Sequence, residues 1–222
     1  MITQLEPIIQ IIDDDRHLVE SIVWIVESIG LKTKTYSRAQ EFLEQYNPNQ
    51  HGCLILDVRL PGMSGLELQQ TLNELGSTLP IIFISGHSDI PLAVRIMKAG
   101  AFDFLTKPFN DQMLLENINK ALSLDKLQQE KNIYFSETEA RYTLLSQREK
   151  QVLQGVVEGK QNRELAAELN ISLKTVEAHR GNMMRKMNVK SASQLVRLML
   201  INPIPDCSKK MPHHVNRQMA TV

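Results

Sequence analysis

The sequence predicts an α/β domain with a parallel sheet covered by helices on both faces, followed by a small all-α domain of four helices. Short apolar runs alternate with segments of 3.6-residue periodicity up to about residue 122, as in a sheet built from β–α units. From Leu144 onwards the periodicity is helical only. The length of 222 residues accommodates one large or two small domains.

Five short apolar runs are expected to form the strands of the sheet. They lie at Ile8–Ile12, Lys32–Tyr36, Cys53–Asp57, Ile81–Ser85 and Phe102–Thr106. Each run is followed by a segment of helical periodicity, at Leu18–Ile29, Ala39–Tyr46, Gly65–Leu75, Ile90–Ala99 and Gln112–Leu122. The first and third runs are apolar enough to be buried on both faces, as central parallel strands are. These units bound a first domain at residues 8–122.

The rest of the chain divides into a linker, a helical domain and a tail. Residues 123–143 are polar and charged and contain no glycine or proline, so we interpret them as a partly helical linker that could continue the fifth helix. Residues 144–201 are expected to hold four helices, at Gln147–Glu158, Arg163–Glu168, Leu173–Met187 and Ala192–Leu200. Residues 202–222, with three prolines and two adjacent histidines, are predicted to be disordered.

Composition argues against several classes of protein. No apolar run reaches about 18 residues, so no membrane-spanning segment is expected, and the acidic N-terminal stretch is unlike a signal peptide. Cys53 and Cys207 are too few for a disulfide scaffold or a dedicated zinc site, and we expect free thiols in a cytoplasmic protein. Two histidines alone, His213 and His214, do not indicate a metal site.

A net charge of zero hides two oppositely charged parts. Residues 1–140 hold 11 Lys and Arg against 19 Asp and Glu, a net charge of −8, and residues 141–222 hold 14 against 6, a net charge of +8. This asymmetry indicates two different tasks, and a basic part of this size indicates a nucleic-acid partner.

Polar side chains gather at the expected carboxyl ends of four strands, where ligands bind in sheets of this topology. They are Asp13, Asp14 and Asp15 after the first strand, Asp57 at the end of the third, Ser85 at the end of the fourth and Lys107 after the fifth. Asp15 is expected to cap the following helix. Lys107–Pro108 is a candidate cis peptide bond.

Three carboxylates in one crevice repel each other unless a cation joins them. Oxygen ligands without His or Cys favour Mg²⁺, which takes only a few protein carboxylates. We expect Asp14, Asp57 and the backbone carbonyl of Arg59 as ligands. Asp13 is expected to bind the ion through a water molecule.

A site of this kind suits phosphoryl transfer to a carboxylate. Asp57 is the expected nucleophile because it lies centrally, at the end of a strand. Lys107 is expected to pair with the phosphoryl oxygens, and the Ser85 hydroxyl is expected to hydrogen-bond to another of them.

These motifs resemble those of the receiver domain of two-component response regulators. They read DDD at 13–15, LDVRLPGMSG at 56–65, ISGHSD at 84–89 and FDFLTKPF at 102–109. The separations also fit, with 43 residues from Asp14 to Asp57, 28 more to Ser85 and 22 more to Lys107. The resemblance implies a flavodoxin-like (βα)5 fold for residues 8–122.

Matched by position, the functional residues of this family fall on Asp13 and Asp14 (acidic pair), Asp57 (phosphoacceptor), Ser85 (switch hydroxyl), Phe104 (switch aromatic) and Lys107. At the switch hydroxyl Thr is the commoner residue. The resemblance implies that a sensor histidine kinase donates the phosphoryl group, and the chain has no Gly-rich ATP loop of its own. We therefore expect no enzyme activity beyond Mg²⁺-dependent autophosphotransfer.

Two enzyme classes share part of the pattern. Phosphatases of the haloacid-dehalogenase type also use a strand-end aspartate, but their second aspartate would fall at Arg59. A hydrolase using Ser85, His87 and Asp89 is the other alternative, although triad members meet through the fold rather than in one short run. We interpret SGHSD as a loop entering the fourth helix, with Asp89 as its cap.

The segment NRELAAELNISLKTVEAHRG at 162–181 has the spacing of a helix-turn-helix. Val176, Met183 and Met187 recur on one face of its second helix and are expected to lie in the core. The segment resembles the LuxR/NarL/FixJ-type helix-turn-helix, closely the FixJ branch, over about 60 residues.

The resemblance places the DNA contacts on this second helix. Glu177, Ala178 and Gly181 fall where base edges are usually contacted, although some relatives have a basic residue at the glycine position. Ala178 could meet a thymine methyl group, and Glu177 could accept from a cytosine amino group. The expected phosphate contacts are Lys174, Thr175, Arg180 and Lys186.

Together the two domains predict a phosphorylation-controlled transcription regulator. Phosphorylation of Asp57 is expected to draw in Ser85 and to let Phe104 rotate into the space it leaves. The resemblance implies a homodimer on two half-sites of promoter DNA, with RNA polymerase as a further partner. The alternative is a receiver with a protein-interaction output, in which the C-terminal helices form a dimerisation module.

Overall fold

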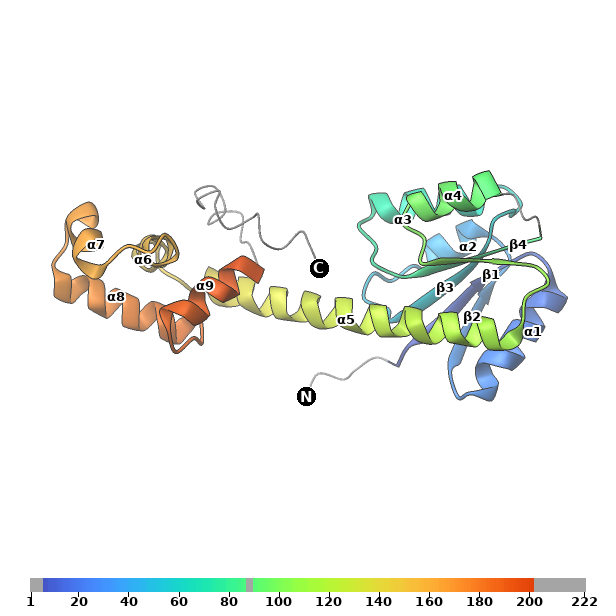
Figure 1. The fold of residues 1–222 in the computed structure, drawn as a ribbon, viewed down its shortest axis with the longest axis horizontal. Helices are drawn as coiled ribbons and strands as arrows, with labels where there is room; N and C mark the ends of the chain where they lie inside the picture. Colours follow the sequence, from blue (N-terminus) through green and yellow to red (C-terminus); the bar gives the residue numbers. More distant parts are fainter. Residues whose placement is uncertain (1–5, 87–89, 202–222) are drawn as a thin grey trace. The chain divides into compact units, whose positions relative to one another are not determined.

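The computed structural model describes residues 6–86 and 90–201 (Figure 1). The chain divides into two compact units, Met1–Glu130 and Lys131–Val222. The tail at 202–222, Cys207, the His213–His214 pair and the loop residues His87 and Asp89 lie outside the described residues. The expectations for those positions stay predictions.

The N-terminal unit contains the predicted parallel sheet. Its strands are β1 (Ile8–Ile12), β2 (Lys32–Tyr36), β3 (Gly52–Asp57), β4 (Ile81–Ser85) and β5 (Asp103–Thr106), in the order β2-β1-β3-β4-β5. All neighbouring strands pair in parallel, with Ile8 opposite both Lys32 and Gly52. The flavodoxin-like (βα)5 fold is confirmed, and β1 and β3 are the central strands that their apolar sequences predicted.

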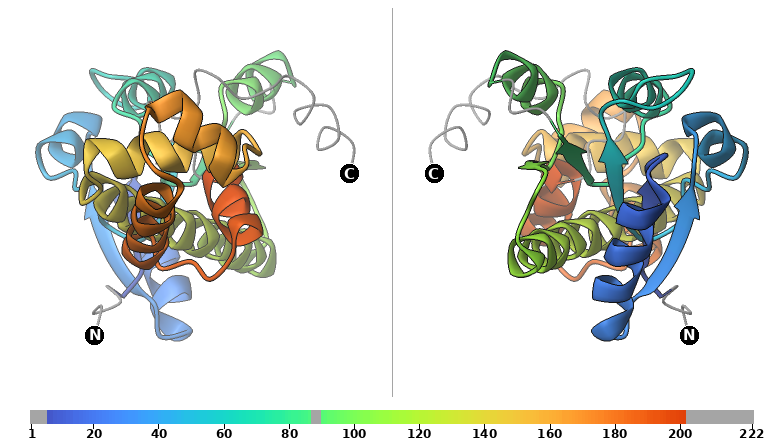
Figure 2. Two further views of the ribbon diagram at one scale, coloured as in Figure 1. Left: turned by 90° about the vertical axis from the view of Figure 1, so that its left-hand side faces the viewer. Right: turned by 90° about the vertical axis from the view of Figure 1, so that its right-hand side faces the viewer.

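Helices cover both faces of the sheet (Figure 2). They are α1 (Arg16–Ser28), α2 (Ala39–Glu44), α3 (Gly65–Glu74), α4 (Ile90–Lys98) and α5 (Asp111–Thr143). One hydrophobic cluster packs Phe42, Leu68 and Ile96 of α2, α3 and α4 against the sheet. A second cluster packs Ile22 of α1 and Ile118 of α5 against the opposite face.

The ends of the elements follow from local chemistry. Helix α1 begins at Arg16, two residues before the predicted start, because Asp15 caps it: Oδ1 accepts hydrogen bonds from the N–H groups of His17 (3.1 Å) and Leu18 (3.3 Å). Strand β3 begins at Gly52, one residue earlier than predicted. A Cβ there would collide with the Ile8 carbonyl oxygen, and its φ of +141° also favours glycine.

Helix α5 continues without interruption through residues 123–143. The segment that we interpreted as a partly helical linker is therefore helical throughout, in keeping with its lack of glycine and proline. The division between the two units falls inside this helix, after Glu130.

The C-terminal unit contains α6 (Gln147–Val157), α7 (Asn162–Leu169), α8 (Leu173–Lys186) and α9 (Ala192–Ile201). Val176, Met183 and Met187 are fully buried in its core, as their spacing predicted. Helix α7 ends at Asn170 in the left-handed conformation (φ 52°), and Ser172 caps α8 by accepting from the Thr175 N–H at 3.1 Å. This tight turn gives the predicted helix-turn-helix.

Two further findings concern the composition. Within the described ranges, no helix combines the length and the hydropathy needed to cross a membrane. Cys53 is a free and buried thiol, and burial raises its pKa to about 12, with the charge of Asp125 as a second cause. Cys53 is therefore an inert residue of the core.

Candidate functional site

The predicted site residues of the N-terminal unit follow neighbouring strands at one edge of the sheet. Asp13 follows β1, Asp57 and Ser85 end β3 and β4, and Lys107 follows β5. The Lys107 N–H donates to the Ser85 carbonyl at 2.7 Å, which continues the β4–β5 ladder past the last strand residue. The Lys107–Pro108 peptide bond is cis, as the sequence suggested.

Lys107 joins two carboxylates at this edge. Its Nζ donates to Asp13 Oδ2 at 2.7 Å and to Asp57 Oδ1 at 2.6 Å. The side chains of Asp13 and Asp57 are only 1% and 8% exposed, and that of Lys107 is 24% exposed. Three residues that are far apart in the sequence thus form one partly buried charged cluster.

Backbone N–H groups orient the two carboxylates. Asp57 Oδ2 accepts the Arg59 N–H at 2.6 Å, and Asp13 Oδ1 accepts the Asp15 N–H at 2.9 Å. Each carboxylate therefore has one oxygen held by the turn that follows its strand and the other held by Lys107. This geometry fixes both side chains before any ligand arrives.

The protonation equilibria reflect the burial. Burial raises the pKa of Asp13, against the opposing hydrogen bonds from Lys107 and Asp15, and the nearby charge of Asp57 also raises it. Burial lowers the pKa of Lys107, but its hydrogen bonds to Asp13 and Asp57 outweigh this and the pKa is raised overall. The site holds a buried negative charge that favours a cation beside it.

The other predicted residues lie around this cluster. Asp14 is exposed directly after Asp13, and Arg59 is exposed after Asp57. Ser85 is buried, with 2% of its surface exposed. Phe104 on β5 is half-buried and packs against the cluster that contains Phe83, its partner in the β4–β5 register. The contacts in the structure thus join Asp13, Asp57 and Lys107, while Asp14 and Phe104 lie at the margin.

The donor set fits Mg²⁺. Asp13, Asp14 and Asp57 offer oxygen ligands only, and the buried pair favours a neighbouring cation. In the part of the chain that the structure describes, no three His, Cys, Asp or Glu side chains converge closely enough to enclose a metal.

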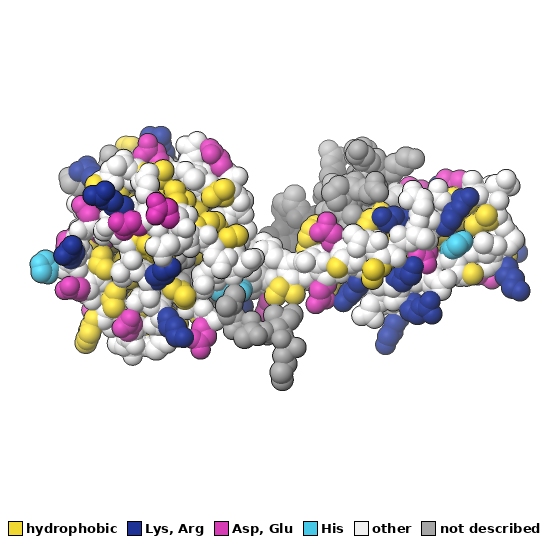
Figure 3. Space-filling view, turned by 180° about the vertical axis from the view of Figure 1, so that it is seen from behind, with side chains coloured by type: hydrophobic (Ala, Val, Ile, Leu, Met, Phe, Trp, Pro, Cys, Tyr) yellow, Lys and Arg dark blue, Asp and Glu magenta, His cyan; other side chains and the backbone are white. Residues whose placement is uncertain are grey.

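The second candidate site is the exposed face of α8. Lys174, Glu177, Ala178 and Gly181 are exposed, whereas Val176 on the opposite face is fully buried. Figure 3 shows Lys and Arg side chains spread over the surface of the C-terminal unit. The helix therefore presents one face to solvent over most of its length, as readout of a DNA groove requires.

Three of the four residues that we predicted to contact phosphates already have bonding partners within the C-terminal unit. Arg180 Nη1 donates to Asn162 Oδ1 of α7 at 2.6 Å, and the Thr175 hydroxyl lies 2.7 Å from the Ser172 hydroxyl. Lys186 Nζ donates to Glu149 Oε2 at 2.7 Å and to the Leu144 carbonyl at 3.1 Å.

Lys186 has two bonding partners inside the C-terminal unit. Its partner Glu149 is buried, and a buried carboxylate that loses its cation is strongly destabilising. The lysine therefore serves to hold the end of α8 against the start of α6. The side chain of Lys186 is still 35% exposed, so its place among the DNA contacts stays a prediction. Sequence reasoning missed Glu149, the partner of Lys186, and Asn162, the partner of Arg180, because only the packing of the helices brings each pair together.

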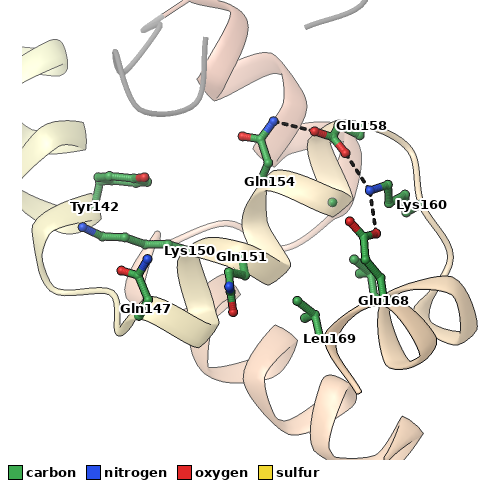
Figure 4. A pocket seen from close by; sticks show the side chains of 11 residues that line it. Tyr142, Gln147, Lys150, Gln151, Gln154, Glu158, Lys160, Glu168 and Leu169 are labelled. Atoms are coloured by element: carbon green, nitrogen blue, oxygen red, sulfur yellow. Dashed lines mark hydrogen bonds and ion pairs between the residues drawn. The ribbon is translucent and has the colours of Figure 1, made fainter. Parts of the chain in front are cut away.

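A pocket of about 300 Å³ lies between α6 and α7 (Figure 4). Lys160 forms two ion pairs there, with its Nζ 3.0 Å from Glu158 and 2.6 Å from Glu168, whereas Lys150 Nζ lies 4.6 Å from the centre of the uncharged Tyr142 ring. The pocket contains none of the residues predicted for either site. Its ion pairs hold α7 to the end of α6.

Comparison with known families identifies both units. The model for the response regulator receiver domain matches residues 9–119, and the model for bacterial regulatory proteins of the luxR family matches residues 143–199. The carboxylate cluster lies in the first match and α8 lies in the second. The fold and its sites define a receiver domain joined to a LuxR-type DNA-binding domain.

Relatives cover nearly the whole chain. The response regulator protein TmoT of Ectopseudomonas mendocina is 51% identical over 193 residues, 87% of this chain and 88% of TmoT. The transcriptional regulatory protein FixJ of Azorhizobium caulinodans is 40% identical over 204 residues, 92% of this chain and 97% of FixJ. The solved structure of the response regulator StyR matches with a TM-score of 0.79 at 42% identity, covering 88% of this chain and 98% of StyR.

The chain belongs to the family of two-component response regulators of the LuxR/FixJ type. It is a phosphorylation-dependent transcription regulator whose output domain binds DNA. TmoT is a response regulator and FixJ a transcriptional regulatory protein, and the LuxR-family match favours a DNA-binding output over the protein-interaction output that the sequence left open.

Proposed function

We propose that Asp57 is the phosphoacceptor and that a sensor histidine kinase is the phosphoryl donor. The observation that carries this proposal is the bridge of Lys107 between Asp13 and Asp57 at the carboxyl edge of the sheet. It leaves a pre-oriented carboxylate beside a fixed positive charge. A phosphoryl group arriving there would find a nucleophile and a counter-charge already in position.

The transfer step uses Asp57 as an attacking nucleophile. A carboxylate oxygen forms an O–P bond with the phosphohistidine phosphorus while the N–P bond breaks, and the leaving imidazole nitrogen keeps the electron pair and takes up a proton. Lys107 loses one carboxylate partner as Asp57 becomes an acyl phosphate. Its ammonium group then pairs with a phosphoryl oxygen while remaining bound to Asp13.

Mg²⁺ is the proposed cofactor, with Asp14, Asp57 and the Arg59 carbonyl as its ligands and Asp13 bound through water. When bound, the ion neutralises the negative charge that develops on the phosphoryl oxygens. The exposed position of Asp14 leaves its carboxylate free to turn towards an ion.

The proposed output is a homodimer on promoter DNA in the cytoplasm. Ser85 would hydrogen-bond to the phosphoryl group and Phe104 would move inwards, changing the surface around α4 and β5. Two LuxR-type domains in a dimer can then occupy two half-sites about one helical turn apart. The proposed DNA contacts are Lys174, Thr175, Glu177, Ala178, Arg180, Gly181 and Lys186, and RNA polymerase is the proposed partner at the promoter.

The substitution Asp57→Asn tests the acceptor. Wild-type protein incubated with acetyl phosphate and Mg²⁺ is expected to gain the mass of one phosphoryl group and to dimerise in light scattering, because the carboxylate can attack phosphorus. D57N is expected to do neither, since an amide is a poor nucleophile. Glu20→Gln, an exposed change on α1, is the control and should behave as wild type. Phosphorylated, dimeric D57N would refute the assignment.

A further inference from the structure

Arg180 and Asn162 connect the two helices of the helix-turn-helix. Arg180 lies on α8 and Asn162 is the first residue of α7, 18 positions earlier in the sequence. The guanidinium Nη1 donates to the amide oxygen Oδ1 at 2.6 Å, a short distance for a hydrogen bond from a charged donor. Both residues are half-buried, so this bond restricts an arginine that would otherwise sample many rotamers.

The chemistry of the bond leaves the charge of Arg180 available. An amide oxygen carries no net charge, so it orients the guanidinium without neutralising it. Lys186 on the same helix differs, because it is paired with the Glu149 carboxylate, whereas Arg185 likewise donates to an amide oxygen, that of Asn182, at 2.9 Å. Among the described residues, no carboxylate lies within ion-pair distance of Arg180.

The guanidinium also keeps free donors. An arginine has five N–H donors in a fixed fork, and Asn162 takes one of them. The remaining N–H groups have no partner in the part of the chain that the structure describes. A planar group held at one corner, with its charge intact, is suited to bind a phosphate oxygen.

We propose that Asn162 is a positioning residue that orients Arg180 for contact with a DNA phosphate. This inference rests on the proposed contact between Arg180 and DNA, and it adds the residue that makes this contact efficient. Because the arginine is ordered before binding, less rotamer entropy is lost when the complex forms. Asn162 acts through Arg180 and need not touch the DNA itself.

Four variants of the full-length protein test the proposal on a labelled duplex of mixed sequence, because a phosphate contact does not depend on base sequence. Affinity is measured over a series of salt concentrations. Arg180→Ala is expected to weaken binding and to lower the salt slope by about 1, since one phosphate contact is lost. Asn162→Ala should weaken binding by about two- to tenfold and leave the slope unchanged, because the charge remains while its orientation is lost.

Asn162→Asp is expected to differ from Asn162→Ala by lowering the salt slope. Its carboxylate can still accept from Arg180, but it neutralises the guanidinium, so both the affinity and the salt slope are expected to fall towards those of R180A. The double variant N162A/R180A should bind no more weakly than R180A alone. Gln151→Ala is the matched control: this exposed glutamine accepts from Arg148 within α6 at 3.1 Å, and its loss should change neither quantity.

The results separate the two levels of the proposal. If R180A binds with wild-type affinity and slope, the phosphate contact itself is refuted. If R180A weakens binding but N162A and N162D bind like wild type, or if the losses of N162A and R180A add up in the double variant, the positioning role of Asn162 is refuted. Thermal unfolding identifies a misfolded variant, and if N162A does not fold, N162D decides by its slope.

Discussion

Lys107 is the residue on which the receiver site depends. Removing it leaves the buried carboxylates of Asp13 and Asp57 facing each other without a cation. We expect Lys107→Ala to lower the free energy of unfolding by about 1–3 kcal/mol at pH 7. Urea denaturation measures this difference, and Mg²⁺ should restore part of it.

The effect of K107A should depend on pH with a definite sign. The pKa of Asp13 is already raised by burial, and without the lysine it rises further. An acid whose pKa is higher in the folded state favours folding at low pH and disfavours it as pH rises. K107A should therefore be closest to wild type near pH 4 and furthest from it at neutral pH. A pH-independent difference would contradict this electrostatic account.

Gly181 lies in the interior of α8, where neither the backbone conformation nor the packing requires a glycine. It has no positive φ, and a Cβ would meet no atom within 4 Å. A helical glycine costs about 1 kcal/mol relative to alanine. Gly181→Ala is therefore expected to raise the stability of the C-terminal unit by about 0.5–1 kcal/mol and yet to weaken DNA binding, because the added methyl group holds the helix away from the groove.

Thermal unfolding and duplex titration of the same samples measure both changes. Ser193→Ala on the exposed side of α9 is the control, since it also improves helix propensity but should leave DNA affinity unchanged. If G181A bound DNA as tightly as wild type, close approach at this position would be disproved.

At the level of elements, two capping boxes of the same sequence type differ in burial. Ser64 and Glu67 cap α3 at the surface, whereas Ser146 and Glu149 cap α6 beside Lys186. Burial raises the pKa of Glu149, but hydrogen bonds from Lys186 and Ser146 outweigh it and lower the pKa overall from its ordinary 4.5. The C-terminal unit therefore depends on this carboxylate being ionised.

An acid whose pKa is lower in the folded than in the unfolded protein stabilises the folded state at pH values above its unfolded pKa. This stabilisation is lost as the pH falls through the folded pKa. We expect Glu149→Gln to cost about 1–3 kcal/mol at pH 7 and to reduce the loss of stability of the C-terminal unit below about pH 4.5. Chemical denaturation between about pH 3 and pH 7, a range that includes the ordinary pKa of a glutamate, measures both the cost at pH 7 and the loss of stability at low pH. Glu67→Gln is the control, and an equally large effect there would rule out the role of Lys186.

At the level of the whole molecule, α5 joins two units that each have their own core. Residues 131–137 of this helix are all exposed, so tertiary packing supports the helix least there. Helices without tertiary contacts are marginally stable and open locally. Trypsin is therefore expected to cut first after Lys131, apart from sites in 202–222, and to leave two resistant fragments.

Mass spectrometry of a short digestion identifies these fragments. The first cuts should fall in α5 before any cut at Lys107 or Arg180, which are bonded within their units. Early cleavage inside either unit would show that the continuous helix is as stable as the cores that it connects.

Much of the architecture could be predicted from the sequence because its signals are local. The strands β1, β2 and β4 have the predicted bounds, and the helices differ mainly at their ends, where caps and turns decide. Residues 123–143 were interpreted as only partly helical, since apolar periodicity weakens where a helix is mostly exposed.

By itself the sequence determined the parallel sheet, the helix-turn-helix and the set of polar residues at the strand ends, because apolar period and strand-end position depend on near neighbours. Only the tertiary structure decided which charges are partners. Lys107 meets Asp13 and Asp57, Lys186 meets Glu149, and Arg180 meets Asn162. These pairs join residues 18 to 94 positions apart, and such distances are closed by the packing of the cores rather than by local propensity.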